Sequence, residues 1–151
     1  MSKDPVLIPT IASDAAGSGG VGAVCGDDYL QEEYPSWLQG AHSNHLELYA
    51  LVRAFEHWAP LFAGKVVVML SDNTVAVGAC QKMSSPISNL NAMLMQLAIT
   101  AAKHDISFAV RHVPGVRNVA ADALSRRRPL PHQFLHDVSL SLNMSQVFDV
   151  L

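Results

Sequence analysis

Five consecutive apolar residues, 66–70, stand between Lys65 and the polar stretch Ser71-Asp72-Asn73-Thr74. A run this short, without alternating polar residues, is typical of a central strand buried on both faces of a sheet. Such a strand requires covering layers on both sides, and therefore favours a layered α/β fold. The polar stretch after it predicts the start of a helix that runs to about Gln81.

The segments before this run predict an antiparallel meander. Residues with high β propensity indicate strands over about 5–15, 21–25 and 29–34. A glycine-rich turn at 16–20 and a hairpin signal at 26–28 separate them.

The remaining segments predict further helices and one more strand. Apolar residues at helical spacing predict a helix over about 44–59, with Ser43 as its N-cap. A long helix is expected over about 87–104, a strand over 107–112 and a last helix over about 117–127. The order βββαβααβα predicts an α/β fold in which helices flank a mixed sheet. We expect Trp37 and Trp58 to serve packing.

Composition supports a compact intracellular domain. Half of the 151 residues are hydrophobic and 15% are charged, against about 25% in an ordinary soluble domain. No apolar run approaches the roughly 20 residues that cross a bilayer, and the N-terminal residues do not resemble a secretory signal. Cys25 and Cys80 lie far apart without a CxxC motif, which argues against a zinc site and favours a reducing compartment.

Charge is distributed unevenly along the chain. Residues 1–64 hold two basic and eight acidic residues, a net charge of −6, and residues 65–151 hold eight basic and five acidic residues, a net charge of +3. This asymmetry is compatible with an acidic metal-binding cleft beside a basic flank, although charge counts do not by themselves predict one.

Four acidic residues lie at the ends of predicted elements or on an inward-facing helix side. Asp14 ends the first strand, and Asp72 follows the central strand. Glu47 is expected in the first turn of a helix, on its inward side, and Asp122 in the last helix. If the first and central strands are neighbours, Asp14 and Asp72 converge and Glu47 can reach them. Clustered carboxylate oxygens suit Mg²⁺ or Mn²⁺, and two such ions about 4 Å apart suit hydrolysis of a phosphodiester.

The acids stand in four segments: Ser13–Gly17, Ser43–Leu48, Leu70–Asn73 and His112–Arg126. These segments resemble the ribonuclease H domain of retroelement reverse transcriptases, and the last one is similar to gypsy-class and DIRS-like retrotransposons in particular. The resemblance covers about residues 6–127, with the motifs in the family's order. It implies a ribonuclease H-like fold with a mixed five-stranded sheet, three antiparallel strands followed by parallel ones. The expected domain is 1–127, followed by a C-terminal extension, 128–151, of unknown role.

The resemblance also implies roles for individual residues. The implied metal ligands, for two Mg²⁺ ions that Mn²⁺ can replace, are Asp14, Glu47, Asp72 and Asp122. The implied substrate contacts are Asn44, Ser13, Asn73 and Asn118. His112 matches a loop histidine that moves a proton or helps the product leave.

The activity implied by the resemblance is metal-dependent cleavage of the RNA strand of an RNA–DNA hybrid, leaving a 5′-phosphate, during reverse transcription. The 2′-hydroxyl group would distinguish RNA from DNA. The implied partners are the hybrid and the polymerase domain of the same polyprotein, without a membrane. The expected compartment is intracellular: the cytoplasm, a virus-like particle or the nucleus.

One departure from the family concerns substrate grip. Cellular enzymes of this family carry a basic, tryptophan-bearing protrusion between two helices, whereas the matching stretch here, 82–86, has one positive charge. Many retroelement domains also lack the protrusion. We therefore expect weak hybrid binding by the isolated chain, because backbone affinity grows with the number of phosphates neutralised.

Other interpretations stay open. Taken alone, Asp72 could cap the helix that follows it, and Asp14 could belong to a turn. The whole chain could be a binding module that a host has domesticated and that has lost effective turnover. It could also be another nuclease on the same fold, a 3′→5′ exonuclease or an integrase-like enzyme.

Overall fold

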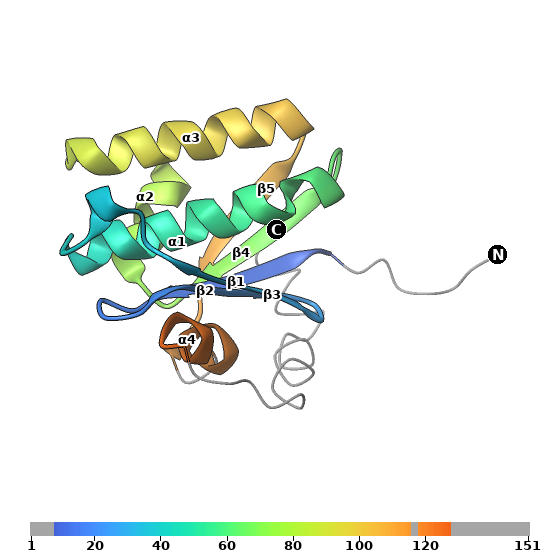
Figure 1. The fold of residues 1–151 in the computed structure, drawn as a ribbon. Coiled ribbons are helices and arrows are strands. Elements are labelled where there is room, and N and C mark those ends of the chain that lie inside the picture. The colour runs from blue at the N-terminus through green and yellow to red at the C-terminus, as the bar shows by residue number, and fades with distance from the viewer. Residues whose placement is uncertain (1–7, 116–117, 128–151) are drawn as a thin grey trace.

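A computed structural model describes residues 8–115 and 118–127, and within them five strands form one mixed sheet (Figure 1). The strands are β1 (Thr10–Ala15), β2 (Gly20–Cys25), β3 (Asp28–Glu33), β4 (Val66–Ser71) and β5 (Ser107–His112). Their order is β3-β2-β1-β4-β5, with β1, β2 and β3 antiparallel and β4 parallel to both β1 and β5. The predicted fold class and strand arrangement are confirmed.

Helices cover both faces of this sheet. The helices are α1 (Ser43–Trp58), α2 (Thr74–Lys82), α3 (Ser88–His104) and α4 (Val119–Ser125), with short 3₁₀ segments at Ser36–Leu38 and Ala59–Leu61. Figure 1 shows α1, α2 and α3 on one side of the sheet and α4 on the other. Among the described helices, none combines the length and hydropathy that a bilayer crossing needs.

The apolar run in β4 is buried on both faces, as predicted. Val67 and Met69 belong to the larger core beneath α1, α2 and α3. Val68 and Leu70, on the opposite face, belong to the smaller core beneath α4. Because both faces of β4 are covered, the strand has no solvent-facing position between Val67 and Leu70 that would favour a polar residue.

The bounds of α1 and α4 differ from the prediction. The N-cap of α1 is His42 rather than Ser43, because the His42 ring nitrogen Nδ1 accepts a hydrogen bond from the Asn44 amide at 3.1 Å. Helix α1 therefore begins one residue earlier, and Glu47 is its fifth residue instead of a first-turn residue. Helix α4 is shorter than predicted, since it ends at Ser125. Predicted structure in 5–7, 116–117 and 128–151 lies outside the described residues.

The two tryptophans have different environments. Trp58 is 1% exposed and its indole N–H donates to Asp28 Oδ2 at 2.8 Å, so the packing prediction is confirmed there. For Trp37 the prediction is wrong, because its side chain is 69% exposed. Trp37 lies in the 3₁₀ segment before α1, outside the helix–sheet layers, and its ring meets Tyr49 edge-on at a centroid distance of 6.0 Å.

Candidate metal centre

The carboxyl ends of two neighbouring strands bring the first two acids together. Strands β1 and β4 run parallel in register, with Ala12 opposite Leu70. Asp14 stands two residues beyond Ala12, and Asp72 two residues beyond Leu70, so both reach the same edge of the sheet. Helix α1 packs across β1 and supplies Glu47 from its buried side.

The three carboxylates form one compact cluster. Asp14, Glu47 and Asp72 each offer an oxygen, and these atoms lie within 4.8 Å of one another. Asp14 is 5% exposed and Glu47 8% exposed, whereas Asp72 is half-buried at the opening of the cluster. Three elements that are distant in the sequence thus deliver three acids to one small volume.

Burial and the charges of neighbouring acids raise the pKa of all three carboxyl groups. Burial, followed by the charge of Asp72, raises the pKa of Asp14 to about 7. Burial, followed by the charges of Asp14 and Asp72, raises the pKa of Glu47 to about 9. Burial and the charge of Asp122 also raise the pKa of Asp72. The folded chain therefore gathers acids that cannot all ionise cheaply near neutral pH without a compensating cation.

The donor set fits a hard metal ion. Carboxylate oxygens are the ligands that Mg²⁺, Mn²⁺ and Ca²⁺ prefer. Within the described part of the chain, Glu47 Oε2 is buried without a hydrogen-bond partner, and a buried acceptor in this state costs free energy. A cation bound between the three acids would satisfy that oxygen and offset the repulsion. The cluster could therefore bind metal ions.

Asp122 lies beside the cluster on α4. A side-chain hydrogen bond with Asp122 contributes to the raised pKa of Asp14, and the charge of Asp122 contributes to the raised pKa of Asp72. Its Oδ1 accepts from Arg126 Nε at 3.0 Å, in an i,i+4 ion pair whose side chains are partly exposed. Three of the four predicted metal ligands thus form the tight group, and the fourth stands next to it in an ion pair.

The loop after β5 passes beside Asp72. His112, the last residue of β5, is exposed, and its ring Nε2 lies 3.2 Å from the backbone oxygen of Asp72. A Cβ atom on Gly115 would lie 3.3 Å from Asp72 Oδ2, so this backbone runs close to the carboxylate. His112 therefore stands at the open side of the cluster.

Two asparagines link α1 to α2 next to the acids. Asn73 Nδ2 donates to Asn44 Oδ1 at 3.2 Å, and both side chains are half-buried. Asn73 Oδ1 also accepts from the Ala76 amide at 2.8 Å and thereby caps α2. Because Asn73 fills the N-cap position, Asp72 is not the cap of this helix, and its carboxylate faces the cluster.

Ser13 and Asn118 are more deeply buried than substrate contacts usually are. Their side chains are 1% and 2% exposed. Asn118 Nδ2 donates to the Ser13 backbone oxygen at 2.9 Å, so the pair ties the start of α4 to β1. Sequence reasoning missed Ser125, which is fully buried at the other end of α4 and hydrogen-bonds Asp14. The available signal was its position three residues after Asp122, on the same helix face.

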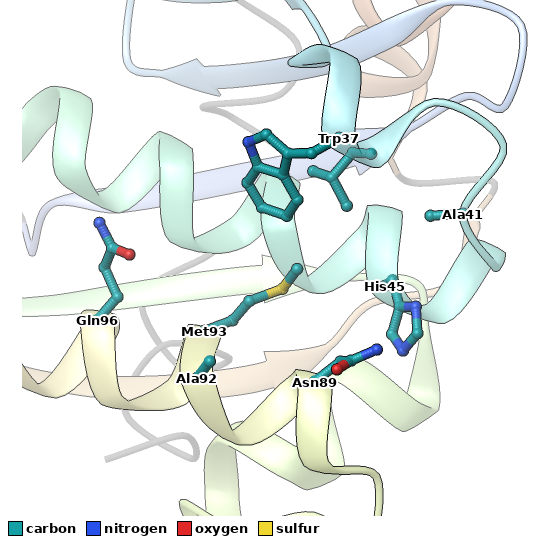
Figure 2. Close-up of a pocket in the computed structure, with 8 residues that line it drawn as sticks. Trp37, Ala41, His45, Asn89, Ala92, Met93 and Gln96 are labelled. Carbon is teal, nitrogen blue, oxygen red and sulfur yellow. The ribbon is translucent and has the colours of Figure 1, made fainter.

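A separate groove of about 370 Å³ lies between the 3₁₀ segment, the start of α1 and the first half of α3 (Figure 2). The lining residues are Trp37, Leu38, Ala41, His45, Asn89, Ala92, Met93 and Gln96. Figure 2 shows Trp37 on one side of the groove and the α3 residues on the other. Among the residues that the structure describes, none of the four predicted acids lines this groove, and neither does any lysine or arginine.

Comparison with solved structures shows a ribonuclease H-like fold. The N-terminal ribonuclease H domain of Rv2228c from Mycobacterium tuberculosis, solved as a fusion with maltose-binding protein, matches with a TM-score of 0.66 at 19% identity, over 81% of this chain and 98% of that chain. Ribonuclease H1 from Halobacterium salinarum NRC-1 matches with a TM-score of 0.57 at 20% identity, over 87% and 99%. LC11 ribonuclease H1 in complex with an RNA/DNA hybrid matches with a TM-score of 0.60 at 19% identity, over 80% and 95%.

At these identities the likeness extends to the fold alone. No protein-family model and no curated protein matches the sequence.

Proposed function

We propose that this chain is the ribonuclease H domain of a retroelement reverse transcriptase polyprotein, and that it hydrolyses the RNA strand of RNA–DNA hybrids. The observation that carries this proposal is the meeting of Asp14, Glu47 and Asp72 within 4.8 Å on a ribonuclease H-like fold. Clustered carboxylates can hold two metal ions, and two ions support in-line hydrolysis of a phosphodiester. Cleavage of the RNA strand of a hybrid needs this chemistry.

In this proposal each acidic residue holds metal. Asp14, Glu47 and Asp72 bind two Mg²⁺ ions, which Mn²⁺ can replace, and Asp122 joins them by exchanging its ion pair with Arg126 for a place in the site. When bound, the ions would activate a water molecule and stabilise the leaving oxygen. Burial of Asp14 and Glu47 keeps bulk water away from their carboxylates and strengthens their hold on a cation.

The residues at the opening of the cluster would handle substrate and product. Asn44 and Asn73 are half-buried side by side, next to Asp72, where an RNA strand would pass. The exposed ring of His112 stands where it could deliver a proton to the leaving group or help the product depart. Ser13 and Asn118 contribute by holding α4 against β1.

Retroelement origin is supported by the four sequence segments and by the short connection between α2 and α3. Helix α2 ends at Lys82 and α3 begins at Ser88, so the connection has room for no further helix. A domain without a basic protrusion would depend on the attached polymerase to hold the hybrid. We propose that residues 1–127 form the domain and that 128–151 are a C-terminal extension. We propose that the domain acts in the cytoplasm, a virus-like particle or the nucleus.

The deciding experiment uses an RNA–DNA hybrid with a labelled RNA strand, incubated with Mn²⁺ and separately with Mg²⁺. Single-stranded RNA and duplex DNA serve as substrate controls. The test variant is Asp72→Asn, and the matched control is Asp105→Asn, because Asp105 caps α3 in the left-handed conformation that asparagine also tolerates. We expect the wild type and the Asp105 variant to cut only the hybrid's RNA, leaving 5′-phosphates, and the Asp72 variant to lose at least about 100-fold in rate.

The other outcomes separate the alternatives. Cutting of duplex DNA would indicate a different nuclease on this fold. Metal binding without any cutting, even when the polymerase domain is supplied, would indicate a binding module. Equal cutting by the Asp72→Asn variant would contradict the proposed site.

A further inference from the structure

Ser125 connects the metal cluster to α4. Its side chain is fully buried, and its hydroxyl lies 3.0 Å from Asp14 Oδ2 and 2.7 Å from the Asp122 backbone oxygen. The hydroxyl donates to both acceptors in a three-centre hydrogen bond. The Ser125 side chain thus contacts both the carboxylate of Asp14 in β1 and the backbone of Asp122, the fourth predicted metal ligand.

The backbone at Ser125 is held firmly in place. Helix α4 has seven residues, too few to be stable without tertiary contacts. Its C-terminal end lies directly against β2 and the preceding turn. A Cβ atom on Gly22 would collide with the Ser125 amide, and one on Gly19 with the Ser125 carbonyl oxygen. Gln31 Nε2 also donates to the Leu124 oxygen at 2.7 Å. The hydroxyl is therefore presented from a fixed point.

We propose that Ser125 is a positioning residue that orients the Asp14 carboxylate for metal binding and sets the place of Asp122 relative to it. The inference rests on the proposed metal site, and it assigns to Ser125 no contact with metal or substrate. A hydrogen bond to one carboxylate oxygen restricts rotation of the carboxylate group, whose last torsion has a broad intrinsic distribution. Hydrogen bonds of this kind to metal-binding groups change metal affinity or activity by about 10- to 100-fold when they are removed.

The test compares Ser125→Ala with Gln31→Ala in the full chain. Both substitutions remove a side-chain hydrogen bond that holds the end of α4, but only the first removes one from Asp14. The measurements are the thermal unfolding of the metal-free chain, the Mn²⁺ concentration that gives half of the maximal rise in Tm, and the Mn²⁺ dependence of hybrid cleavage. A role limited to packing would lower the metal-free Tm in both variants and leave the Mn²⁺ dependence unchanged.

We expect Ser125→Ala to need about 10-fold or more Mn²⁺ in both metal assays, with KM for the hybrid close to wild type. Gln31→Ala should keep the wild-type Mn²⁺ dependence. In an Asp14→Asn background, Ser125→Ala should cause little further loss of the remaining Mn²⁺ response, because the carboxylate it orients is already gone.

Three results would overturn the inference. The first is a wild-type Mn²⁺ dependence in Ser125→Ala, and the second is an equal change in Gln31→Ala. The third is a Ser125→Ala effect that persists undiminished in the Asp14→Asn background. The Mn²⁺ titration does not require turnover, so a chain that binds Mn²⁺ without cutting, even when the polymerase domain is supplied, would refute the proposed function and still test Ser125. A wild type without any Mn²⁺ response would overturn both proposals together.

Discussion

Asp14 at the end of β1 and Glu47 in α1 place carboxylate oxygens within 4.8 Å of each other in the interior of the protein. Burial, followed by the charge of Asp14, raises the pKa of Glu47, and Glu47 Oε2 has no hydrogen-bond partner among the residues that the structure describes. A pair built only for stability would include a cation or a donor at this point. The cluster therefore lowers the stability of the metal-free chain, and a bound metal ion would restore that stability.

Replacing Glu47 by glutamine should stabilise the metal-free chain and abolish its response to metal. The substitution removes the buried charge and supplies an amide that can donate to Asp14, so we expect a gain of about 1–3 kcal/mol in the free energy of unfolding. The rise in Tm on adding Mg²⁺ or Mn²⁺ should then largely disappear, because fewer anionic ligands remain. Thermal unfolding by circular dichroism, with chelator and with metal, measures both effects.

The matched control is Glu56→Gln, the same substitution on the same helix but outside the cluster. It should alter neither the metal-free Tm nor the metal response by much. A metal response of wild-type size in Glu47→Gln would show that the ions bind elsewhere.

The stability of the metal-free chain should fall as the pH rises. The pKa of Asp14 is raised to about 7 and that of Glu47 to about 9, so the folded chain binds more protons than the unfolded chain between their ordinary values near 4 and these raised values. Excess protons on the folded state mean that raising the pH disfavours folding. We expect the Tm measured in chelator to decrease from about pH 5 to about pH 9.

Metal should reverse this trend, because ions bind the deprotonated carboxylates. The rise in Tm caused by Mg²⁺ should therefore grow with pH over the same window. The Glu47→Gln variant provides the internal comparison, since it lacks the group whose pKa is most raised and should show a shallower decline in chelator. A wild-type Tm in chelator that increases across this window would contradict the repulsion inferred for the cluster.

Much of the fold follows from local patterns in the sequence. The unbroken apolar run predicted a strand covered on both faces, and Asp72 lies at its carboxyl end because that is where the run stops. The N-cap of α1 was mispredicted because the ring of His42 acts as the acceptor, a role usually filled by Ser, Thr, Asp or Asn. Trp37 was mispredicted because apolar character does not reveal that a residue lies outside the layers.

The candidate site was predictable only in part. Asp14 and Asp72 meet because β1 and β4 are neighbouring strands. Local patterns do not show which strands are neighbours, so that expectation came from the family resemblance. Ser125 depends on a different relationship, the close approach of α4 to β2 at Gly22, which no periodicity in the sequence encodes. A residue that acts by contacting a metal-binding side chain from another element is therefore found from the structure and not from the sequence.

That close approach yields a prediction for Gly22. A Cβ atom there would meet the Ser125 amide and the Ala121 oxygen, and would lie 2.8 Å from the Leu124 carbonyl carbon, all of them backbone atoms of α4 that cannot move aside independently. We expect Gly22→Ala to lower the free energy of unfolding by about 1–3 kcal/mol through overpacking. Displacement of α4 should also weaken the Mn²⁺-induced rise in Tm. Gly17→Ala is the control, because its Cβ would meet no described residue within 4 Å. A result equal to that control would show that α4 is not tightly seated.

His112 offers a test of turnover that is separate from metal binding. Its ring is exposed and contacts the backbone oxygen of Asp72, so His112→Ala should change the free energy of unfolding by less than about 0.5 kcal/mol and leave the Mn²⁺-induced rise in Tm intact. Cleavage of the hybrid should slow by roughly 100-fold, the size of a general acid–base contribution. His57→Ala, which removes another exposed histidine away from the cluster, should cut at the wild-type rate.

Single-turnover kinetics then distinguish the two roles open to His112. If the ring delivers a proton to the leaving group, the rate with enzyme in excess over hybrid falls as much as the steady-state rate, because the chemical step itself is slower. If the ring helps the product leave, the single-turnover rate stays at the wild-type level and only repeated turnover slows. Wild-type rates in both regimes would exclude His112 from the reaction and leave the carboxylates and their ions as the catalytic groups.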